Sequence, residues 1–292
     1  MNISVIGGDL RTAILAEMYA NEKNTIYTYG LEKYFEENLK KSNIIICKNL
    51  EEAIWNSQYI ISGMPFTKDK INVNAPFASS KIKLEELKNV FLKQNNKKIF
   101  FAGGIPESLC DNIYNVEFVD LLKIEELTIL NAIPTVEGTI KIVIDKRIET
   151  IHESNILVCG FGRIGKILCD RFYKLGANIY CVARKDSDLA WIRENRYIPL
   201  KYSELQYYAN KLEIVINTVP YMVLDKENLN LFNKNTLFID LASSPGGIDS
   251  KYAQEKGFNV ITALGIPGKE APKTAAKYIK EILDNNINQK KI

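Results

Sequence analysis

Short apolar runs recur along this 292-residue chain, and they constrain its fold more than any other feature. In the C-terminal half they stand at residues 156–159, 179–182, 214–217 and 237–240, and a last one stands at 260–262. Near-continuous apolar runs of this length are typical of strands that are buried on both faces. Helical spacing of apolar residues separates them, which predicts a parallel sheet with right-handed crossovers.

The N-terminal half shows the same alternation. Its apolar runs are residues 3–6, 26–28, 44–47, 59–62 and 99–102. Between them, Leu84, Leu87, Val90 and Phe91 would share one face of a helix. The sequence therefore predicts an α/β protein with two parallel-sheet, Rossmann-like domains, an interdomain cleft and a dehydrogenase-like architecture.

The domain boundaries follow from these patterns. We expect an N-terminal substrate domain over residues 1–132, an interdomain helix over 133–150 and a nucleotide-binding domain over 151–268. Pro134 suits the first turn of that helix, with Thr135 or a neighbour as its cap. A final helix at 270–288, apolar at Ala275, Ile279, Ile282 and Leu283, is expected to return to the first domain.

Composition excludes several classes of function. His152 is the only histidine, and none of the five cysteines forms a C-x-x-C pair, so no metal site is expected. A formal net charge of +3 with scattered basic residues argues against nucleic acid as a partner. No apolar run reaches the roughly 18 residues that indicate a membrane span. Met1 leads directly into a strand without a signal-peptide pattern, so the cytoplasm is the expected compartment.

The most specific motif is the G-x-G-x-x-G pattern at residues 160–165. It follows an apolar strand and opens an amphipathic helix, which is the context a dinucleotide site requires. Gly160 would form the tight turn, Gly162 would let the backbone approach a pyrophosphate, and Gly165 would let the helix lie close to the sheet. Arg163 and Ile164 complete this expected cofactor turn. The alternative is a tight strand–helix turn that binds nothing.

The residues after the next strand indicate which dinucleotide is bound. NAD sites usually carry an acidic residue there, whereas this chain has Arg184 and Lys185, which suit a 2′-phosphate. NADP is therefore expected and NAD is less favoured, the alternative being two solvated surface cations. Later loops would complete the crevice at the carboxyl ends of the strands. Their expected cofactor contacts are Thr218, Val219, Pro220, Leu241, Ala242 and Gly265.

The histidine count also limits the reaction. A D-2-hydroxy-acid dehydrogenase needs an acid–base histidine after the last strands, but residues 265–274 contain none. His152 precedes the first strand of its domain, at the opposite end of the sheet from the nicotinamide, so we expect a structural role for it. An alanine-dehydrogenase mechanism and a Ser-His-Asp or Cys-His nucleophile meet the same objection.

In several short sequence segments, this chain resembles the family of dipicolinate synthase A subunits, which are sporulation enzymes of endospore-forming bacteria. The resemblance spans nearly the whole chain and departs between residues 64 and 83, where this chain has a longer loop. Two strings are specific, IPTVEGTI at 133–140 and DLASSPGG at 240–247. The others are VIGGD at 5–9, GFGR at 160–163, INTVP at 216–220 and APKTA at 271–275.

The resemblance implies NADP-linked oxidation of dihydrodipicolinate to dipicolinate in the mother cell. The dihydro ring would come from hydroxytetrahydrodipicolinate by loss of water. A flavoprotein-like B subunit is the implied partner, and a homo-oligomer is expected. Two readings from other classes stay open. One is a cofactor-binding scaffold or regulatory subunit, and the other is a dehydrogenase for another small dicarboxylate or 2-oxo or 2-hydroxy acid.

A dicarboxylate substrate needs cations, hydroxyls or backbone donors around it. Glu137 is the expected proton acceptor, although a carboxylate in the first turn of a helix is an equally good explanation for it. Lys273 and Ser243 join it as expected catalytic residues. The expected substrate contacts, several of them through backbone donors, are Arg11, Thr135, Thr139, Ser244, Gly246, Gly247 and Thr274.

Overall fold

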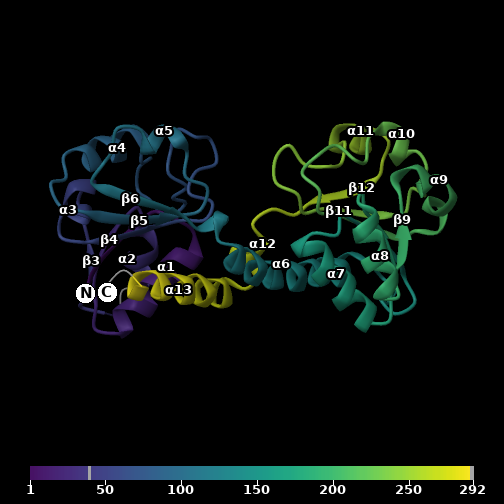
Figure 1. The fold of residues 1–292 in the computed structure, drawn as a ribbon, viewed down its shortest axis with the longest axis horizontal. Helices are drawn as coiled ribbons and strands as arrows, with labels where there is room; N and C mark the ends of the chain where they lie inside the picture. The colour runs from purple at the N-terminus through teal and green to yellow at the C-terminus, as the bar shows by residue number, and fades with distance from the viewer. Residues whose placement is uncertain (39–40, 290–292) are drawn as a thin grey trace. The chain divides into compact units, whose positions relative to one another are not determined.

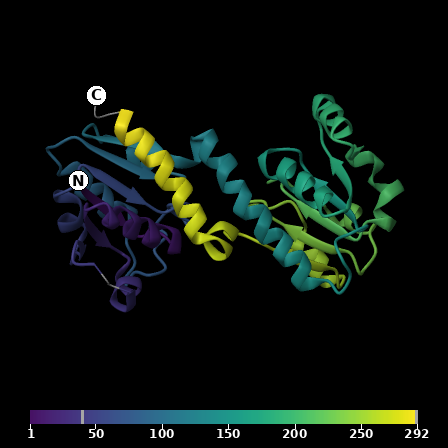
Figure 2. The same cartoon turned by 90° about the horizontal axis from the view of Figure 1, so that it is seen from below.

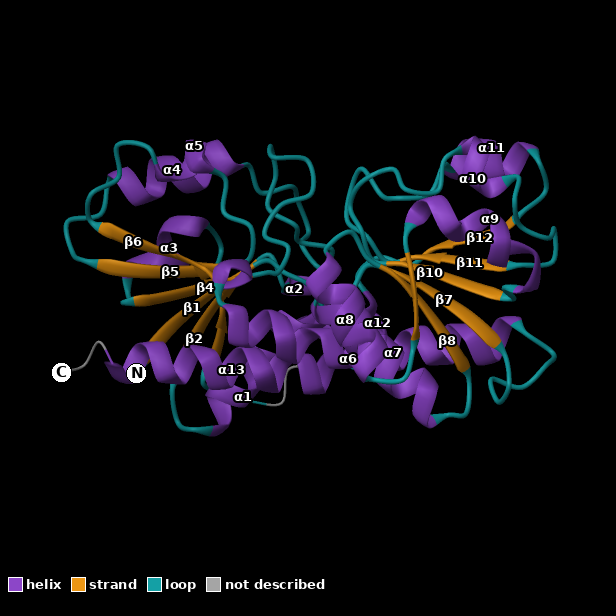
Figure 3. Ribbon diagram, turned by 45° about the vertical axis from the view of Figure 1, so that its right-hand side comes forward, coloured by secondary structure: helices purple, strands orange, loops and turns teal. Residues whose placement is uncertain are grey.

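The structure is a computed structural model that describes residues 1–38 and 41–289. Its chain divides into two compact units. The first combines Met1–Asn131 with the segment from Gly268 onward, and the second is Ala132–Pro267. Each unit is a six-stranded parallel sheet between helices (Figures 1 and 3), so the predicted α/β, Rossmann-like fold class is confirmed.

In the first unit the strand order is β3-β2-β1-β4-β5-β6. The strands are β1 (Asn2–Ile6), β2 (Thr25–Tyr29), β3 (Ile44–Ile46), β4 (Tyr59–Ser62), β5 (Lys98–Ala102) and β6 (Val116–Asp120). The helices are α1 (Leu10–Asn21), α2 (Glu32–Asn38), α3 (Leu50–Trp55), α4 (Leu84–Leu92), α5 (Glu107–Cys110), the 3-10 turn η1 (Leu121–Lys123) and α13 (Pro272–Gln289). The sequence patterns missed β6.

Alternate residues of each strand in this unit enter different hydrophobic cores. Phe101 of β5 packs with the core under α1 and α13, whereas its neighbour Phe100 packs with the core under α3 and α4. All five residues of β5 are buried. This two-sided burial explains why these strands read as continuous apolar runs rather than as alternating ones.

The C-terminal helix α13 lies against α1, and Figure 2 shows the two side by side. Ile279 and Leu283 of α13 are buried in the same core as Leu15 of α1. At the edge of this contact the Tyr19 hydroxyl donates to Asp284 at 2.9 Å. The last described segment of the chain therefore belongs to the first unit.

In the second unit the order is β12-β11-β10-β7-β8-β9. Its strands are β7 (Asn155–Cys159), β8 (Asn178–Val182), β9 (Ile198–Leu200), β10 (Ile214–Asn217), β11 (Leu237–Asp240) and β12 (Asn259–Thr262). Its helices are α7 (Arg163–Lys174), α8 (Asp186–Glu194), η2 (Tyr202–Glu204), α9 (Leu205–Tyr208), η3 (Ala209–Lys211), α10 (Lys226–Leu229) and α11 (Ser250–Glu255). The short helix α12 (Ile266–Glu270) contains the boundary at which the chain returns to the first unit. The order reverses direction between β7 and β10, the switch point at which such sheets bind ligands.

The helix α6 (Glu125–Lys146) corrects one prediction. We expected a helix over residues 133–150 with Pro134 in its first turn, but α6 begins at Glu125 and Pro134 lies well inside it. A proline inside a helix costs about 3 kcal/mol. Burial of Leu127 in one core and of Val136 and Val143 in another offsets that cost, at roughly 1.5–3 kcal/mol for each side chain.

By length and composition, α6 is the one helix among the described residues that could cross a membrane. Its apolar content has another explanation in the structure, because Leu127, Val136 and Val143 are fully buried in the hydrophobic cores. We therefore interpret α6 as a core helix.

Candidate functional site

The turn between β7 and α7 is built from close contacts that only glycine allows. Gly160 has a φ of +98°, and a β-carbon there would lie 2.7 Å from Thr218 Oγ1. A β-carbon on Gly165 would lie 2.0 Å from the carbonyl oxygen of Gly160. Both glycines thus hold α7 tightly against the sheet, as the sequence motif requires.

Gly162 differs from its two neighbours in the motif. It has an ordinary extended backbone (φ −83°, ψ −161°), and a β-carbon there would meet no atom within 4 Å. Nothing in the described protein therefore demands glycine at this position. A ligand that must approach the backbone closely would require glycine here, and the pyrophosphate of a dinucleotide approaches the backbone in this way.

The first turn of α7 is suited to an anion. Gly162 is its N-cap and makes no side-chain capping bond. The helix dipole and the backbone N–H groups of the first turn of α7 favour negative charge at this point. Arg163 begins the helix, and Ile164 packs partly buried against the core of the second unit.

Two buried thiols beside this turn are neutral. Burial raises the pKa of Cys159 well above its ordinary value. A hydrogen bond with Cys169, followed by burial, raises the pKa of Cys181 in the same direction. A thiolate at either position would repel a pyrophosphate. Because the raised pKa favours the neutral thiol, the two cysteines do not oppose an anion at this turn.

Arg184 and Lys185 follow β8 after one intervening residue, Ala183, and both are exposed. Within residues 1–38 and 41–289, Arg184 forms no ion pair, so its guanidinium is available to a ligand. The neighbouring Lys201 instead pairs with Asp186 at 3.1 Å, in the first turn of α8. Two cations thus follow the second strand of the unit, the strand whose end lies beside the adenosine ribose in Rossmann domains.

The expected cofactor loops all leave the carboxyl edge of the second sheet. The Thr218 hydroxyl donates to the Cys159 carbonyl at 2.8 Å and backs the glycine turn. Val219 is half-buried and Pro220 is exposed after β10, whereas Leu241 and Ala242 are buried after β11. Gly265, with a φ of +69° and open space around it, precedes α12.

Two buried polar residues at this edge were not among the predicted site residues. Asn217 ends β10 and is fully buried, and Asp240 ends β11 and is 2% exposed. The Asn217 Nδ2 donates to Asp240 Oδ1 at 2.8 Å. The available signal was a polar residue closing an otherwise apolar strand, which marks a strand end facing a ligand crevice.

Four of the expected substrate contacts are buried or hydrogen-bonded inside the protein. The Thr139 hydroxyl is fully buried and donates to the Thr135 carbonyl at 2.8 Å, one turn back along α6. Thr135 is itself buried. The N–H of Gly246 donates to the Ser243 carbonyl, and that of Gly247 donates to Asp240 Oδ2. The Thr139 hydroxyl and the two glycine N–H groups therefore already have hydrogen-bond partners inside the protein.

Arg11 is likewise committed internally. Its side chain is 4% exposed and pairs with Asp9 at 2.7 Å, and it also donates to the Met64 carbonyl. A β-carbon on Gly268 would lie 3.1 Å from the guanidinium. The Nε and Nη2 atoms of Arg11 are thus both engaged within the first unit.

The remaining candidates are exposed. Glu137 lies in the middle of α6, so the first-turn explanation of this carboxylate is wrong. Lys273 and Thr274 open α13 in the first unit. In the described part of the chain, the hydroxyls of Ser243 and Ser244 have no hydrogen-bond partner and face solvent after β11.

The corresponding turn of the first unit cannot take a dinucleotide in the same way, because the 64–83 loop fills it. The Gly8 N–H donates to the Asn74 carbonyl at 2.8 Å. A β-carbon on Gly7 would lie 2.9 Å from Val73 Cγ1. Phe66 and Ile82 of the loop are buried in the core of the unit. The 64–83 loop therefore covers the glycine turn that follows β1.

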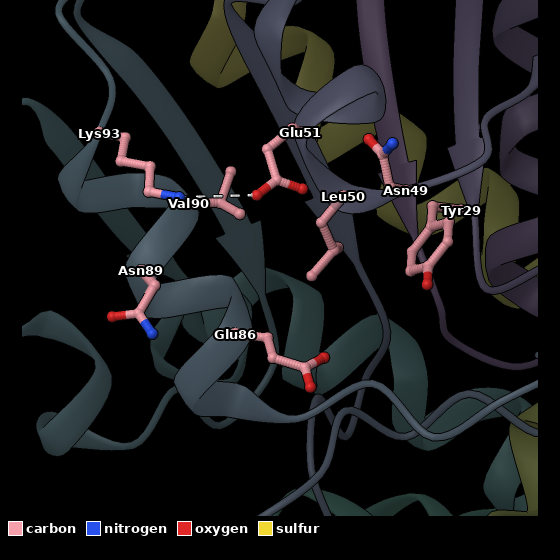
Figure 4. Close-up of a pocket in the computed structure, with 8 residues that line it drawn as sticks. All are labelled: Tyr29, Asn49, Leu50, Glu51, Glu86, Asn89, Val90 and Lys93. Carbon is pink, nitrogen blue, oxygen red and sulfur yellow. Dashed lines mark ion pairs between the residues drawn. The ribbon is translucent and has the colours of Figure 1, made fainter.

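Two surface hollows lie elsewhere in the first unit. One, of about 310 Å³, lies beside α3 and α4, and Figure 4 shows Glu51 and Lys93 paired across it at 3.9 Å. Asn49 in its wall already caps α3 by accepting from the Glu52 N–H. The other, of about 340 Å³, includes Cys110 and Lys123. Neither hollow contains a predicted site residue.

Substitution of Gly162 tests the nucleotide turn without disturbing the fold. Gly162→Val places a side chain in open space, so we expect normal stability and loss of dinucleotide binding. Gly165→Val is the contrasting variant, since its side chain would overlap the Gly160 carbonyl and destabilise the protein. Thermal unfolding and calorimetric titration with NADP and NAD measure both effects. Retained affinity in a folded Gly162→Val protein would refute the assignment.

Comparison with known proteins agrees with this geometry. Residues 2–122 match the family described as the N-terminal domain of the dipicolinate synthase A subunit. Residues 137–245 match the NAD-binding domain of D-isomer-specific 2-hydroxyacid dehydrogenases. The dipicolinate synthase A subunit of Bacillus subtilis (strain 168) is 32% identical over 286 residues, which cover 97% of this chain and 94% of that protein.

Solved structures show the same relationship. The dipicolinate synthase A chain from Bacillus subtilis has a TM-score of 0.86 at 31% identity, over 99% of this chain and 96% of that one. The A subunit from Bacillus halodurans has a TM-score of 0.86 at 28% identity, over 97% and 96%. A transhydrogenase from Sinorhizobium meliloti, 12% identical with a TM-score of 0.65, shares the fold. The second unit is thus a nicotinamide-dinucleotide domain of the dehydrogenase type, and the whole chain belongs to the family of dipicolinate synthase A subunits.

Proposed function

We propose that this protein oxidises dihydrodipicolinate to dipicolinate with NADP as the hydride acceptor. The observation that carries the proposal is a glycine turn with open space at Gly162, in a chain that belongs to the family of dipicolinate synthase A subunits. In the reaction, the dihydropyridine ring loses a hydride to the bound nicotinamide and a proton to a base, and becomes aromatic. We place the reaction in the cytoplasm of the mother cell during sporulation.

Aromatisation explains how the site works without a histidine. His152 lies before β7, at the amino end of the strand, and its side chain is 69% exposed. The gain of an aromatic ring makes the oxidation downhill, so a strong acid–base histidine is less necessary. Holding substrate and cofactor in line supplies much of the rate enhancement, up to several kcal/mol.

NADP rather than NAD is proposed because of the two cations after β8. Arg184 and Lys185 are exposed at the carboxyl edge of the sheet, and the three residues that follow β8, Ala183 to Lys185, include no acidic side chain. An acid there would accept hydrogen bonds from a free ribose 2′-hydroxyl, whereas a guanidinium pairs with a 2′-phosphate through two parallel bonds.

For the substrate we propose the exposed polar groups that are not committed internally. Lys273 supplies a cation for a carboxylate, with Thr274 beside it at the start of α13. Ser243 and Ser244 offer hydroxyls after β11. Glu137 is the proposed proton acceptor, because it is an exposed carboxylate whose helix position needs no acid.

A partner and an assembly state complete the proposal. Two of the similar proteins are named as the A component of a synthase, so we propose that this chain also has a partner, a flavoprotein-like B subunit. We also propose a homo-oligomer. A scaffold that binds the dinucleotide only to activate its partner is the competing function.

One assay separates these functions. The purified chain is mixed with NADP and freshly generated dihydrodipicolinate, and dipicolinate absorbance and NADPH formation are followed together. Equal amounts of both products support the proposal. A chain that binds NADPH without turnover is the scaffold, and turnover of another small acid alone would indicate a different dehydrogenase.

Arg184→Ala tests the cofactor preference. We expect NADP binding to weaken by about tenfold to a hundredfold, the usual contribution of a hydrogen bond to a charged group, with NAD binding nearly unchanged. Arg193→Ala, at the exposed far end of α8, is the control for loss of one positive charge. Calorimetric titration gives both affinities. Equal losses for the two cofactors would overturn the assignment.

Lys273→Met tests the carboxylate contact. The variant keeps the length of the side chain and removes its charge, so we expect a higher KM for the substrate and an unchanged NADP affinity. If kcat stays level, Lys273 contributes uniform binding, and if kcat also falls, it positions the substrate for reaction. Lys277→Met, one turn further along α13, is the matched control. A KM equal to that of the wild type would exclude the contact.

Glu137→Gln tests the proton acceptor. We expect unchanged stability and turnover lowered by about 10²-fold or more, because the amide cannot accept the proton. Glu126→Gln on the same helix is the contrasting control. Glu126 lies in the first turn, so its loss should slightly lower the unfolding temperature and leave turnover unchanged. Normal turnover in Glu137→Gln would assign the base elsewhere.

A further inference from the structure

We infer that Asp240 is a positioning residue: its buried carboxylate sets the two loops that face the nicotinamide end of the dinucleotide and the substrate. The inference rests on the proposed function, which supplies the identity of the ligands that these loops bind. It goes beyond the proposed function because it assigns the geometry of these loops to a buried residue beneath them.

The Asp240 carboxylate is saturated by hydrogen bonds. Oδ1 accepts from Asn217 Nδ2 at 2.8 Å and from the Ala242 N–H at 3.1 Å. Oδ2 accepts from the N–H groups of Gly247 at 2.9 Å and Ile248 at 3.3 Å. Three of the four donors are backbone groups of the segment that follows β11. The carboxylate therefore pins both ends of that segment, residues 242 and 247–248, to the end of its own strand.

Asn217 carries the same constraint to the neighbouring loop. Its Oδ1 accepts from the Val219 N–H at 3.1 Å, and its Nδ2 donates to the Val219 carbonyl at 3.0 Å. The amide thus closes the turn after β10 while it binds Asp240. Because β10 and β11 are adjacent parallel strands, one pair of side chains ties two consecutive loops together.

Backbone contacts join the two loops a second time. The N–H groups of Val223 and Leu224 both donate to the Gly247 carbonyl, at 3.0 and 2.9 Å. A β-carbon on Gly247 would lie 2.2 Å from Asn217 Nδ2 and 2.6 Å from the Val219 carbonyl oxygen. The loops therefore pack with no space for adjustment around Gly247.

Between the residues that the Asp240 carboxylate binds, Ser243, Ser244 and Pro245 form an exposed segment. Its two ends are held by one buried carboxylate, so its position follows from that carboxylate. A buried charge is tolerated only when its donors are all in place, which selects a single loop arrangement.

The position in the sheet says which ligand atoms this segment faces. The adenosine ribose belongs at the end of β8, and the pyrophosphate belongs at the β7–α7 turn. The other half of a dinucleotide crosses the switch point toward β10 and β11, where the two tied loops lie. Asp240 itself, 2% exposed beneath them, acts only through the loops.

Asp240→Asn is the decisive variant. An asparagine keeps the size of the side chain but turns an NH₂ group toward two of the four N–H donors, so two of the four hydrogen bonds are lost. We expect kcat for dihydrodipicolinate oxidation to fall by roughly tenfold to a hundredfold, as for a misplacement of about 1 Å. The dissociation constant for NADP should change by less than about threefold, since the glycine turn and Arg184 are unaffected.

Asp249→Asn is the matched control for the same chemical change nearby. Asp249 caps α11 by accepting from the Tyr252 N–H, and asparagine is an equally good cap, so kcat should be unchanged. Asn217→Ser is a second variant that removes one donor and leaves the backbone donors of Asp240. It should lower kcat in the same direction but less, and it keeps the test decisive if Asp240→Asn does not fold.

Two readouts independent of turnover accompany the kinetics. Amide hydrogen exchange should become faster at Ala242, Gly247 and Ile248 in Asp240→Asn and stay unchanged in Asp249→Asn. Calorimetric titration with dipicolinate, in the presence of NADPH, should show weaker binding to Asp240→Asn alone.

These readouts separate the two proposals. If the wild-type chain shows no turnover, the proposed function fails, and hydrogen exchange with dipicolinate titration still decides the role of Asp240. A folded Asp240→Asn protein with wild-type kcat, or one with unchanged dipicolinate affinity, would overturn the inference. So would an equal loss of kcat in Asp249→Asn.

Discussion

Both sheets are buried on both faces, and this constraint decides where the protein can carry out chemistry. Alternate residues of β5 and of β7 enter different hydrophobic cores, so the interiors of these two strands are closed to water. Polar and charged groups that are to meet a ligand must then stand at the strand ends. In the second unit the glycine turn, the two cations and the loops after β10 and β11 all leave the carboxyl edge of one sheet.

The two units show how one topology gives different surfaces. Each strand order reverses beside its first strand, and each first strand ends in a glycine turn. In the first unit, the 64–83 loop places Val73 and the Asn74 carbonyl against that turn, so its N–H group is already satisfied. In the second unit, the space at Gly162 is open. The loops, and not the sheets, therefore decide which unit serves the dinucleotide.

The polar residues near the site fall into two physical groups. Arg11, Thr139, Asn217 and Asp240 are buried, and their hydrogen bonds are made inside the protein. Arg184, Lys273, Ser243 and Ser244 are exposed. Because a buried polar group must be paired, the first group shapes the backbone. The second group is the one that can meet a substrate or cofactor.

The sequence by itself determined the fold class, most strands and the nucleotide turn, because apolar runs, helical spacing and glycine act locally. Only the tertiary structure decided the rest. It extended α6 through Pro134, since burial at both ends of the helix outweighs the local cost of a proline. It also brought the Arg11 guanidinium to the Met64 carbonyl and the Asn217 amide to the Asp240 carboxylate. Hydrogen-bond partners depend on which segments meet after folding, and no local pattern records that.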